Sequence, residues 1–150
     1  MQIGAAAYLP VDDELIPTGV VQPVAGTAFD FTKPRPIRHT KTGEQFVYDH
    51  NFCLASAHGK LRRAAWALGA KSGVEMEMWT TEPGVQFYGG HKVAREQPGL
   101  GGRQYGPHAG FCLEAQVWPD APNRPYFPTA MLRPGGTYHH VTEYRFRLDS

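Results

Sequence analysis

Glu114 is the residue whose type and position point most directly to chemistry. It lies in Phe111–Val117, a segment of alternating polarity whose apolar members share one face of a predicted strand. Cys112, Glu114 and Gln116 share the other face, and the proline-rich segment Trp118–Pro128 then ends the strand. A carboxylate at such a position is either a half-exposed surface group or a group that accepts a proton near neutral pH.

Further motifs follow one another in a fixed order along the chain. They are Leu15-Ile-Pro-Thr-Gly19 with Gly26-Thr-Ala-Phe-Asp-Phe31, Tyr48-Asp-His-Asn-Phe52, Thr80-Thr-Glu-Pro-Gly-Val-Gln-Phe-Tyr88, and Phe127-Pro128 with Leu132-Arg-Pro-Gly135. Together with the Glu-x-Gln strand and the Pro-Asp-x-Pro-Asn loop that follows it, this order resembles the C-terminal half of the aldose 1-epimerase (galactose mutarotase) family. The resemblance spans nearly all of the 150 residues.

The resemblance implies roles for three residues. Glu114 matches the catalytic base of the family, and Asp49 and Gln86 match positions that hold sugar hydroxyls. Family members are longer, and their N-terminal half carries an Asn-His-x-Tyr-Phe-type motif with the histidine general acid, together with a further sugar-binding histidine and arginine. That half has no counterpart in this sequence, so the resemblance describes an N-terminally truncated member.

The implied reaction interconverts the α and β anomers of a cyclic sugar and requires a base and an acid. The base takes the proton of the anomeric hydroxyl, and the acid gives a proton to the ring oxygen. Glu114 suits the base, because partial burial in a sugar-filled cleft is expected to raise its basicity. Taken alone, Asp49 could instead cap a turn and Gln86 could be a solvated strand residue. Both lie beside aromatic residues that would suit the apolar walls of a cleft, namely Tyr48, Phe52, Phe87 and Tyr88.

The acid must come from one of the seven histidines or from another polypeptide. His108 would lie roughly 20 Å from Glu114 along a continuous strand. His50 is expected to point to the face opposite Asp49. His91 follows two glycines in a predicted flexible loop, where the family usually has Asn, and is the best substitute acid; an ordinary surface histidine is the alternative.

Composition predicts one globular domain over residues 1–150, since 41% hydrophobic and 12% aromatic residues suffice for a single core. A net charge of +1 does not favour nucleic acid or an anionic membrane, and the basic stretch Lys33–Lys41 is predicted to be a solvated hairpin or loop. No apolar run reaches the roughly 18 residues of a membrane span, and no secretory signal is evident, so a cytoplasmic protein is expected. Cys53 and Cys112 are predicted to be buried free thiols.

Regular Gly and Pro punctuation predicts an all-β fold, an antiparallel β-sandwich. This resembles the C-terminal half of the large supersandwich of the family. Leu61–Leu68 also fits helical spacing, but a strand is preferred because Gly69 and strand-like segments flank it. The predicted strands are Gln2–Tyr8, Gly19–Pro23, Phe46–Leu54, Leu61–Leu68, Val74–Thr80, Val85–Tyr88, Gly110–Val117 and Thr137–Leu148.

Two classes of function follow. One is a mutarotase acting on free aldohexoses such as galactose or glucose, with its acid supplied by His91 or by a separate N-terminal-half chain. The other is a non-catalytic sugar-binding or interaction domain derived from such an enzyme. Neither implies a metal or an organic cofactor, since proton transfer needs only side chains. Strand edges left uncovered by the absent half favour a symmetric homodimer; a monomer covered by its Trp118–Pro128 loop is the alternative.

Overall fold

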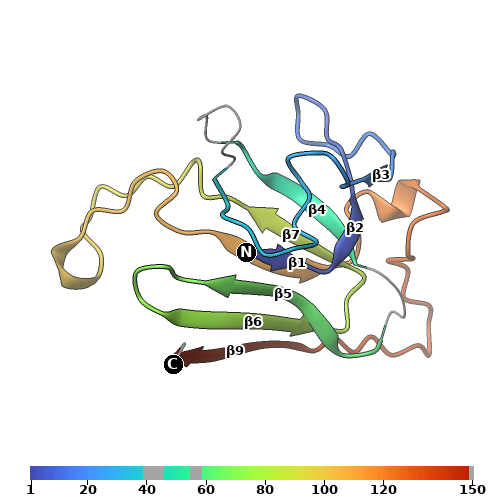
Figure 1. Ribbon diagram of the computed structural model, residues 1–150. Helices are drawn as coiled ribbons and strands as arrows, with labels where there is room; N and C mark the ends of the chain where they lie inside the picture. Colours follow the sequence, from blue (N-terminus) through green and yellow to red (C-terminus); the bar gives the residue numbers. More distant parts are fainter. Residues whose placement is uncertain (39–45, 55–58, 149–150) are drawn as a thin grey trace.

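The computed structural model describes residues 1–38, 46–54 and 59–148, which form two antiparallel sheets packed face to face (Figure 1). In spatial order, the four-stranded sheet contains β1 (Gln2–Ile3), β5 (Arg62–Leu68), β6 (Val74–Thr80) and β9 (Thr142–Leu148). The five-stranded sheet contains β3 (Gln22–Pro23), β2 (Ala5–Tyr8), β4 (Asp49–Leu54), β7 (Gly84–Tyr88) and β8 (Cys112–Gln116). The helical elements of the described residues are two 3₁₀ turns, η1 (Leu100–Gly102) and η2 (Ala121–Asn123). The predicted all-β antiparallel sandwich is confirmed.

The core fills the space between the two sheets. Ala65 and Met78 point into it from the four-stranded sheet, and Phe52, Phe87 and Leu113 point into it from the five-stranded sheet. Successive residues of a strand point to opposite faces, so the residues between these core positions lie on the outer faces. The alternation seen in the sequence therefore decides which side chains can form a site.

The segment Gln2–Tyr8 was predicted as one strand but serves both sheets. Ile3 lies opposite Ala65 in the four-stranded sheet, whereas Ala5 lies opposite Leu54 in the five-stranded sheet. Both Ile3 and Ala5 are buried, so the segment crosses between the sheets without leaving the core.

A β-bulge explains why Leu61–Leu68 also looked helical. The register between β5 and β6 shifts between Arg63 and Ala65, and the consecutive residues Ala64 and Ala65 are both buried. A bulge breaks the strict alternation of a strand, which produced the apparent helical spacing. The strand prediction is confirmed and the helical alternative is wrong.

Several predicted strands are shorter in the structure, and the one predicted over Phe46–Leu54 begins at Asp49. The strand predicted over Gly19–Pro23 is reduced to two residues because Gly19 has a φ of +93°, outside the extended region. The strand predicted over Gly110–Val117 begins at Cys112 and ends at Gln116. The strand predicted over Thr137–Leu148 begins at Thr142. Before it, the Tyr138 hydroxyl and the Val141 N–H donate to side chains of the turn after β6, and the Val141 carbonyl accepts one backbone bond from Thr81.

The basic stretch Lys33–Lys41 is only partly solvated. Its described residues, 33–38, form an irregular segment in which the Arg35 guanidinium lies 4.0 Å from the centre of the Phe31 ring and donates to the Tyr48 hydroxyl. Residues 39–41 lie outside the described residues. No helix in the described part of the chain is long and apolar enough to cross a membrane.

Candidate functional site

The outer face of the five-stranded sheet carries the three residues that the sequence singled out. Asp49 is on β4, Gln86 is on β7 and Glu114 is on β8. Gln86 lies directly opposite Glu114, and Asp49 lies opposite Tyr88, two residues further along β7. Directly opposed residues of an antiparallel sheet point to the same face. The fold thus brings all three residues to one surface, here called the polar face.

Gln86 occupies the middle of this face. Its Nε2 donates a hydrogen bond of 2.9 Å to Oδ1 of Asp49. Its Oε1 is buried and accepts no hydrogen bond from any described residue. A buried acceptor without a donor is unfavourable, and a ligand hydroxyl placed over β7 would supply that donor.

Two carboxylates flank Gln86, one on each neighbouring strand. Because Asp49 and Glu114 are two strands apart and offset by two residues along them, their backbones lie about 12 Å apart across the sheet. A small polyhydroxylated ligand over Gln86 would therefore meet an acidic group on either side. Glu114 is exposed in the structure, so burial that raises its basicity would have to come from the ligand itself.

The carboxylates of the polar face affect the pKa of the Cys112 thiol. Cys112 lies opposite Tyr88 and shares the face with Glu114. Burial, followed by the nearby carboxylates of Glu114 and Asp49, raises the pKa of the Cys112 thiol. The negative potential of the two carboxylates thus extends over the open end of the polar face.

The other end of the polar face is closed by the segment that follows β8. Nε2 of Gln116 donates to Oδ1 of the buried Asn51, and Nε1 of Trp118 donates to the Pro83 carbonyl at 2.8 Å. Gly84 lies directly beneath them and leaves no room for a side chain. A Cβ at this position would come within 2.5 Å of Asn51 Oδ1 and 2.9 Å of Trp118 Cδ1. The face is therefore bounded on the Trp118 side and accessible on the Cys112 side.

His91, the substitute acid suggested by the sequence, lies next to the accessible end. Its ring contacts the ring of Tyr88 with 5.1 Å between centroids, and Tyr88 belongs to the polar face. Nδ1 of His91 is buried and has no hydrogen-bond partner among the described residues. The structure places His91 beside the site on the β7 side.

Two other histidines have different places: His50 lies on the opposite face, and His108 is bound to the backbone just after Tyr88. His50 points to the opposite face from Asp49, as predicted, and its ring packs 4.6 Å from that of Phe29. His108 is not on a continuous strand with Glu114, because it has a φ of +62° and its Nδ1 binds the Gly89 carbonyl at 2.8 Å. The predicted separation along a strand therefore does not apply to His108.

Three of the four expected wall aromatics belong to the core instead. Tyr48, Phe52 and Phe87 are buried between the sheets, and Tyr88 is the one that lies on the polar face. The sequence analysis placed Gln116 on the face of Glu114, as the structure does, but missed Asn51 as a member of this face. Its spacing of two residues from Asp49 was the available signal.

The cysteines differ from each other. Cys53 is buried, and burial raises the pKa of its thiol to about 12. Cys112 is free but exposed, so its predicted burial is wrong, because it occupies the outer face of an edge strand. In the described part of the chain no group of three His, Cys, Asp or Glu side chains is arranged to hold a metal ion.

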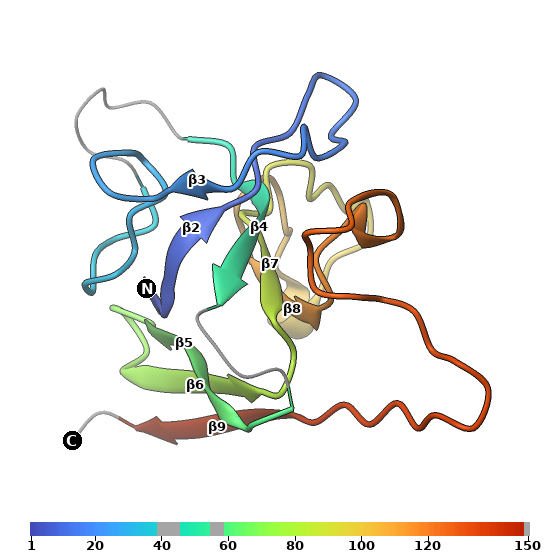
Figure 2. The same ribbon diagram turned by 90° about the vertical axis from the view of Figure 1, so that its right-hand side faces the viewer.

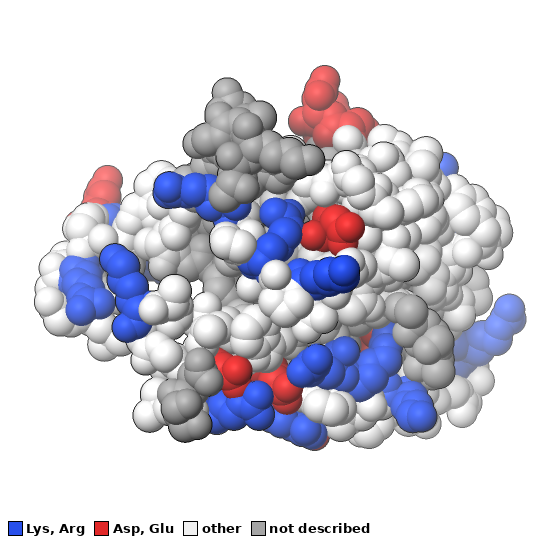
Figure 3. Space-filling view, viewed as in Figure 1, with Lys and Arg blue, Asp and Glu red and all other residues white. Residues whose placement is uncertain are grey.

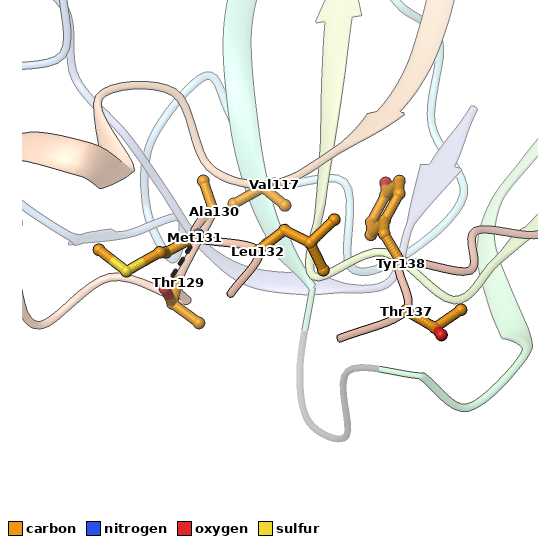
Figure 4. A pocket seen from close by; sticks show the side chains of 7 residues that line it. All are labelled: Val117, Thr129, Ala130, Met131, Leu132, Thr137 and Tyr138. Carbon is orange, nitrogen blue, oxygen red and sulfur yellow. Dashed lines mark hydrogen bonds between the residues drawn. The ribbon is translucent and has the colours of Figure 1, made fainter. Parts of the chain in front are cut away.

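A separate cavity of about 350 Å³ lies beyond the end of β8 (Figure 4). Tyr138 lies at one side of it and donates from its hydroxyl to Oε1 of the buried Glu82. The lining residues are Val117, Thr129, Ala130, Met131, Leu132, Thr137 and Tyr138. These include none of the residues that the sequence suggested for catalysis or sugar binding, so this cavity is distinct from the polar face.

Comparison with solved structures defines the class of fold. A GalM/aldose epimerase homologue from C. elegans superimposes with a TM-score of 0.86 and 24% identity, over 99% of this chain and 45% of that chain. Galactose 1-epimerase from Lactobacillus acidophilus NCFM gives a TM-score of 0.69 with 25% identity. The sandwich is of the galactose mutarotase-like type.

Sequence comparison gives the family. A family model described as Aldose 1-epimerase matches residues 1–145. The chain is 49% identical over 147 residues to galactose mutarotase of Rattus norvegicus, covering 97% of this chain and 43% of that protein. It is 35% identical over 153 residues to aldose 1-epimerase of Escherichia coli (strain K12), with 97% and 44% covered. The chain belongs to the aldose 1-epimerase family and spans less than half the length of these curated relatives.

Proposed function

We propose that the polar face binds a free aldohexose and that the chain acts as an aldose 1-epimerase, with Glu114 as the base. The observation that carries the proposal is the row of Asp49, Gln86 and Glu114 on three neighbouring strands. Membership of the aldose 1-epimerase family supports the reaction class.

Each residue of the row has a distinct task in this proposal. The carboxylate of Glu114 takes the proton of the anomeric hydroxyl, which opens the ring when an acid protonates the ring oxygen. The unpartnered Oε1 of Gln86 accepts a hydrogen bond from a sugar hydroxyl. Asp49 orients the Gln86 amide through the bond at 2.9 Å and offers its second oxygen to another hydroxyl.

We further propose that the acid comes from His91 or from a separate polypeptide that corresponds to the N-terminal half of the relatives. His91 is supported by its position against Tyr88 at the accessible end of the polar face. A protonated imidazole can donate a proton from its ring N–H. The second source is supported by the relatives being more than twice as long as this chain.

Galactose is the first sugar to test, because the mammalian relatives are named galactose mutarotases. We place the protein in the cytoplasm, in hexose metabolism. The free, exposed thiol of Cys112 supports this location, since such thiols persist in reducing compartments.

Polarimetry of freshly dissolved α-D-galactose tests the proposal. We expect the chain by itself to accelerate mutarotation weakly, and Glu114→Gln to return the rate to that of buffer, since a general base contributes about 10²- to 10⁴-fold. Glu96→Gln, which removes a carboxylate from the exposed segment after β7, is the matched control and should keep the wild-type rate. An unchanged rate in Glu114→Gln would remove Glu114 from the mechanism.

The non-catalytic alternative makes a different prediction in the same experiment. It is favoured by the exposure of Glu114 to solvent in this chain. In that case the wild-type chain leaves the mutarotation rate at that of buffer while sugar still binds to the polar face.

A further inference from the structure

The strand β9 leaves one side of the four-stranded sheet open. Among the described strands it pairs with β6 and is last in the sheet order, at the bottom of the view in Figure 2. Every second residue of such a strand directs its N–H and C=O groups away from the sheet. Unpaired edges of this kind form hydrogen bonds with a further strand where one is available.

Apolar side chains line the same edge. Tyr144, Phe146 and Leu148 lie opposite Met78, Met76 and Val74 and thus point to the core side, yet they are 47%, 65% and 73% exposed. A hollow of about 400 Å³ opens beside Phe146 and reaches Phe111, the residue before β8. The sandwich is therefore open between the edges of its two sheets, and a strand added to β9 would bring side chains to cover this opening.

The outer face of β9 carries one acidic and two basic side chains, Glu143, Arg145 and Arg147, and Arg147 pairs with Glu75 of β6. Glu143 and Arg145 are neighbours on this face, and Arg145 covers the Trp79 ring at 4.3 Å. In Figure 3 acidic and basic side chains lie close together near the lower border, where Figure 1 places this sheet. Charged edges disfavour indiscriminate strand pairing, but their pattern can also favour one register.

The charge pattern of β9 complements itself in one two-fold register. In an antiparallel pair centred on Tyr144, Glu143 lies opposite Arg145 of the second copy, and Arg145 opposite its Glu143. Centring the pair on Glu143 would oppose two carboxylates. Centring it on Arg145 would pair Glu143 with Arg147 twice but would oppose two guanidinium groups at the axis. Opposite charges across a strand pair stabilise it and like charges destabilise it. A second copy of this chain therefore fits the edge.

We propose that two copies join through β9 in an antiparallel pair centred on Tyr144, so that their four-stranded sheets become one continuous sheet. The ion pair that Arg145 and Glu143 form within each chain, at 2.6 Å, is exchanged for one between the chains, so the dimer keeps two such pairs. In this pair Phe146 lies opposite Thr142 of the second copy, so the apolar rows of the two copies lie side by side on the core side of the joined sheet. A symmetric dimer closes both open edges with one contact.

Light scattering after size-exclusion chromatography at micromolar concentration tests the proposal. We expect a species of twice 16.6 kDa. Arg145→Glu should yield a monomer by placing like charges opposite each other, and the swap E143R/R145E should restore the dimer. Arg63→Glu is the matched control, because it reverses a charge of the same sheet away from β9 and should leave the dimer intact. A monomeric wild type, or a dimer unaffected by Arg145→Glu, would overturn the proposal.

Disulfide trapping tests the register. In a Cys112→Ser background, Tyr144→Cys places two thiols opposite each other at the two-fold axis, within the usual range for a disulfide. It should cross-link on mild oxidation, whereas Leu148→Cys should not. Cross-linking of Leu148→Cys alone would overturn the register. Since Tyr144→Cys also removes the bond from the Tyr144 hydroxyl to the Leu113 carbonyl, the charge swap decides the matter if this variant does not fold.

Discussion

The two faces of the five-stranded sheet come from the same strands and have opposite properties. The inner face presents Phe52 and Phe87, both fully buried, to the core. The outer face presents Asp49, Gln86 and Glu114, which are partly buried or exposed. A shift of one residue along a strand moves a side chain from one face to the other. Substitutions on the inner face should therefore change the stability of the fold, whereas substitutions of the neighbouring residues on the outer face should change the proposed sugar site.

The largest expected effect comes from the inner face. Phe87 packs against the rings of Phe31, Tyr48 and Phe52 with centroid distances of 5.1–6.3 Å. Phe87→Ala should lower the free energy of unfolding by about 3–5 kcal/mol, through lost transfer energy and the cavity left behind. Urea denaturation measures this.

The neighbouring position on the outer face is the matched control. Gln86→Ala should change the free energy of unfolding by less than about 1 kcal/mol, because a partly exposed polar group with one unpartnered oxygen is removed. Equal losses for Phe87→Ala and Gln86→Ala would contradict the division of the sheet into a core face and a binding face.

A smaller effect is expected where the outer face is closed. Gly84→Ala forces a Cβ against Asn51 and Trp118, so the segment after β8 has to move away. Overpacking of this kind lowers the free energy of unfolding by about 1–3 kcal/mol. Gly106→Ala, with no atom within 4 Å of the added Cβ, is the control and should be nearly neutral. Equal stability of both variants would show that Gly84 is not needed for this closure.

His50, on the inner face, should make stability depend on pH. Burial lowers the pKa of His50, and the nearby Asp49 opposes that shift. The unfolded chain therefore binds a proton more readily, so stability is present above about pH 6.5 and falls as the pH drops below it, by at most about 1.4 kcal/mol per pH unit. His50→Phe should flatten this slope in urea denaturation at several pH values; an unchanged slope would assign it to other groups.

The sequence predicted the three residues of the proposed site but not the segments that surround them. Asp49, Gln86 and Glu114 were found through motifs that resemble those of the family, and the register of β4, β7 and β8 places them on one face. The closure by Trp118 could not be predicted, because it depends on how an irregular proline-rich segment returns to Pro83. Cys112 was assigned to the interior because a thiol is usually buried, whereas the order of strands in the sheet exposes it.

The fold class followed from Gly and Pro punctuation, while strand ends depended on tertiary contacts. Residues before Thr142 look like a strand in sequence, but Tyr138 binds Glu82 and Val141 binds Thr81 instead. Gln2–Tyr8 reads as one strand because nothing local marks the point where it changes sheets. Such features arise from contacts between distant segments, which a local pattern does not contain.

The smallest predicted effect concerns the thiol on the polar face. Because the carboxylate of Glu114 contributes to the raised pKa of Cys112, Glu114→Gln should lower that pKa and increase the thiolate fraction at pH 8. Burial is the larger cause, so alkylation should accelerate by less than about tenfold, the change for one pKa unit. An unchanged alkylation rate would show that Glu114 does not act on this part of the face.

Protection of Cys112 by sugar tests the central claim most directly. The rate at which iodoacetamide alkylates Cys112 is measured at increasing D-galactose, with the buried Cys53, whose pKa is about 12, as an unreactive internal reference. If the polar face is the sugar site, the rate falls to a plateau as the sugar saturates, and Gln86→Leu weakens or abolishes the protection. A wild-type rate that stays constant at all sugar concentrations would contradict the assignment of the sugar site to this face.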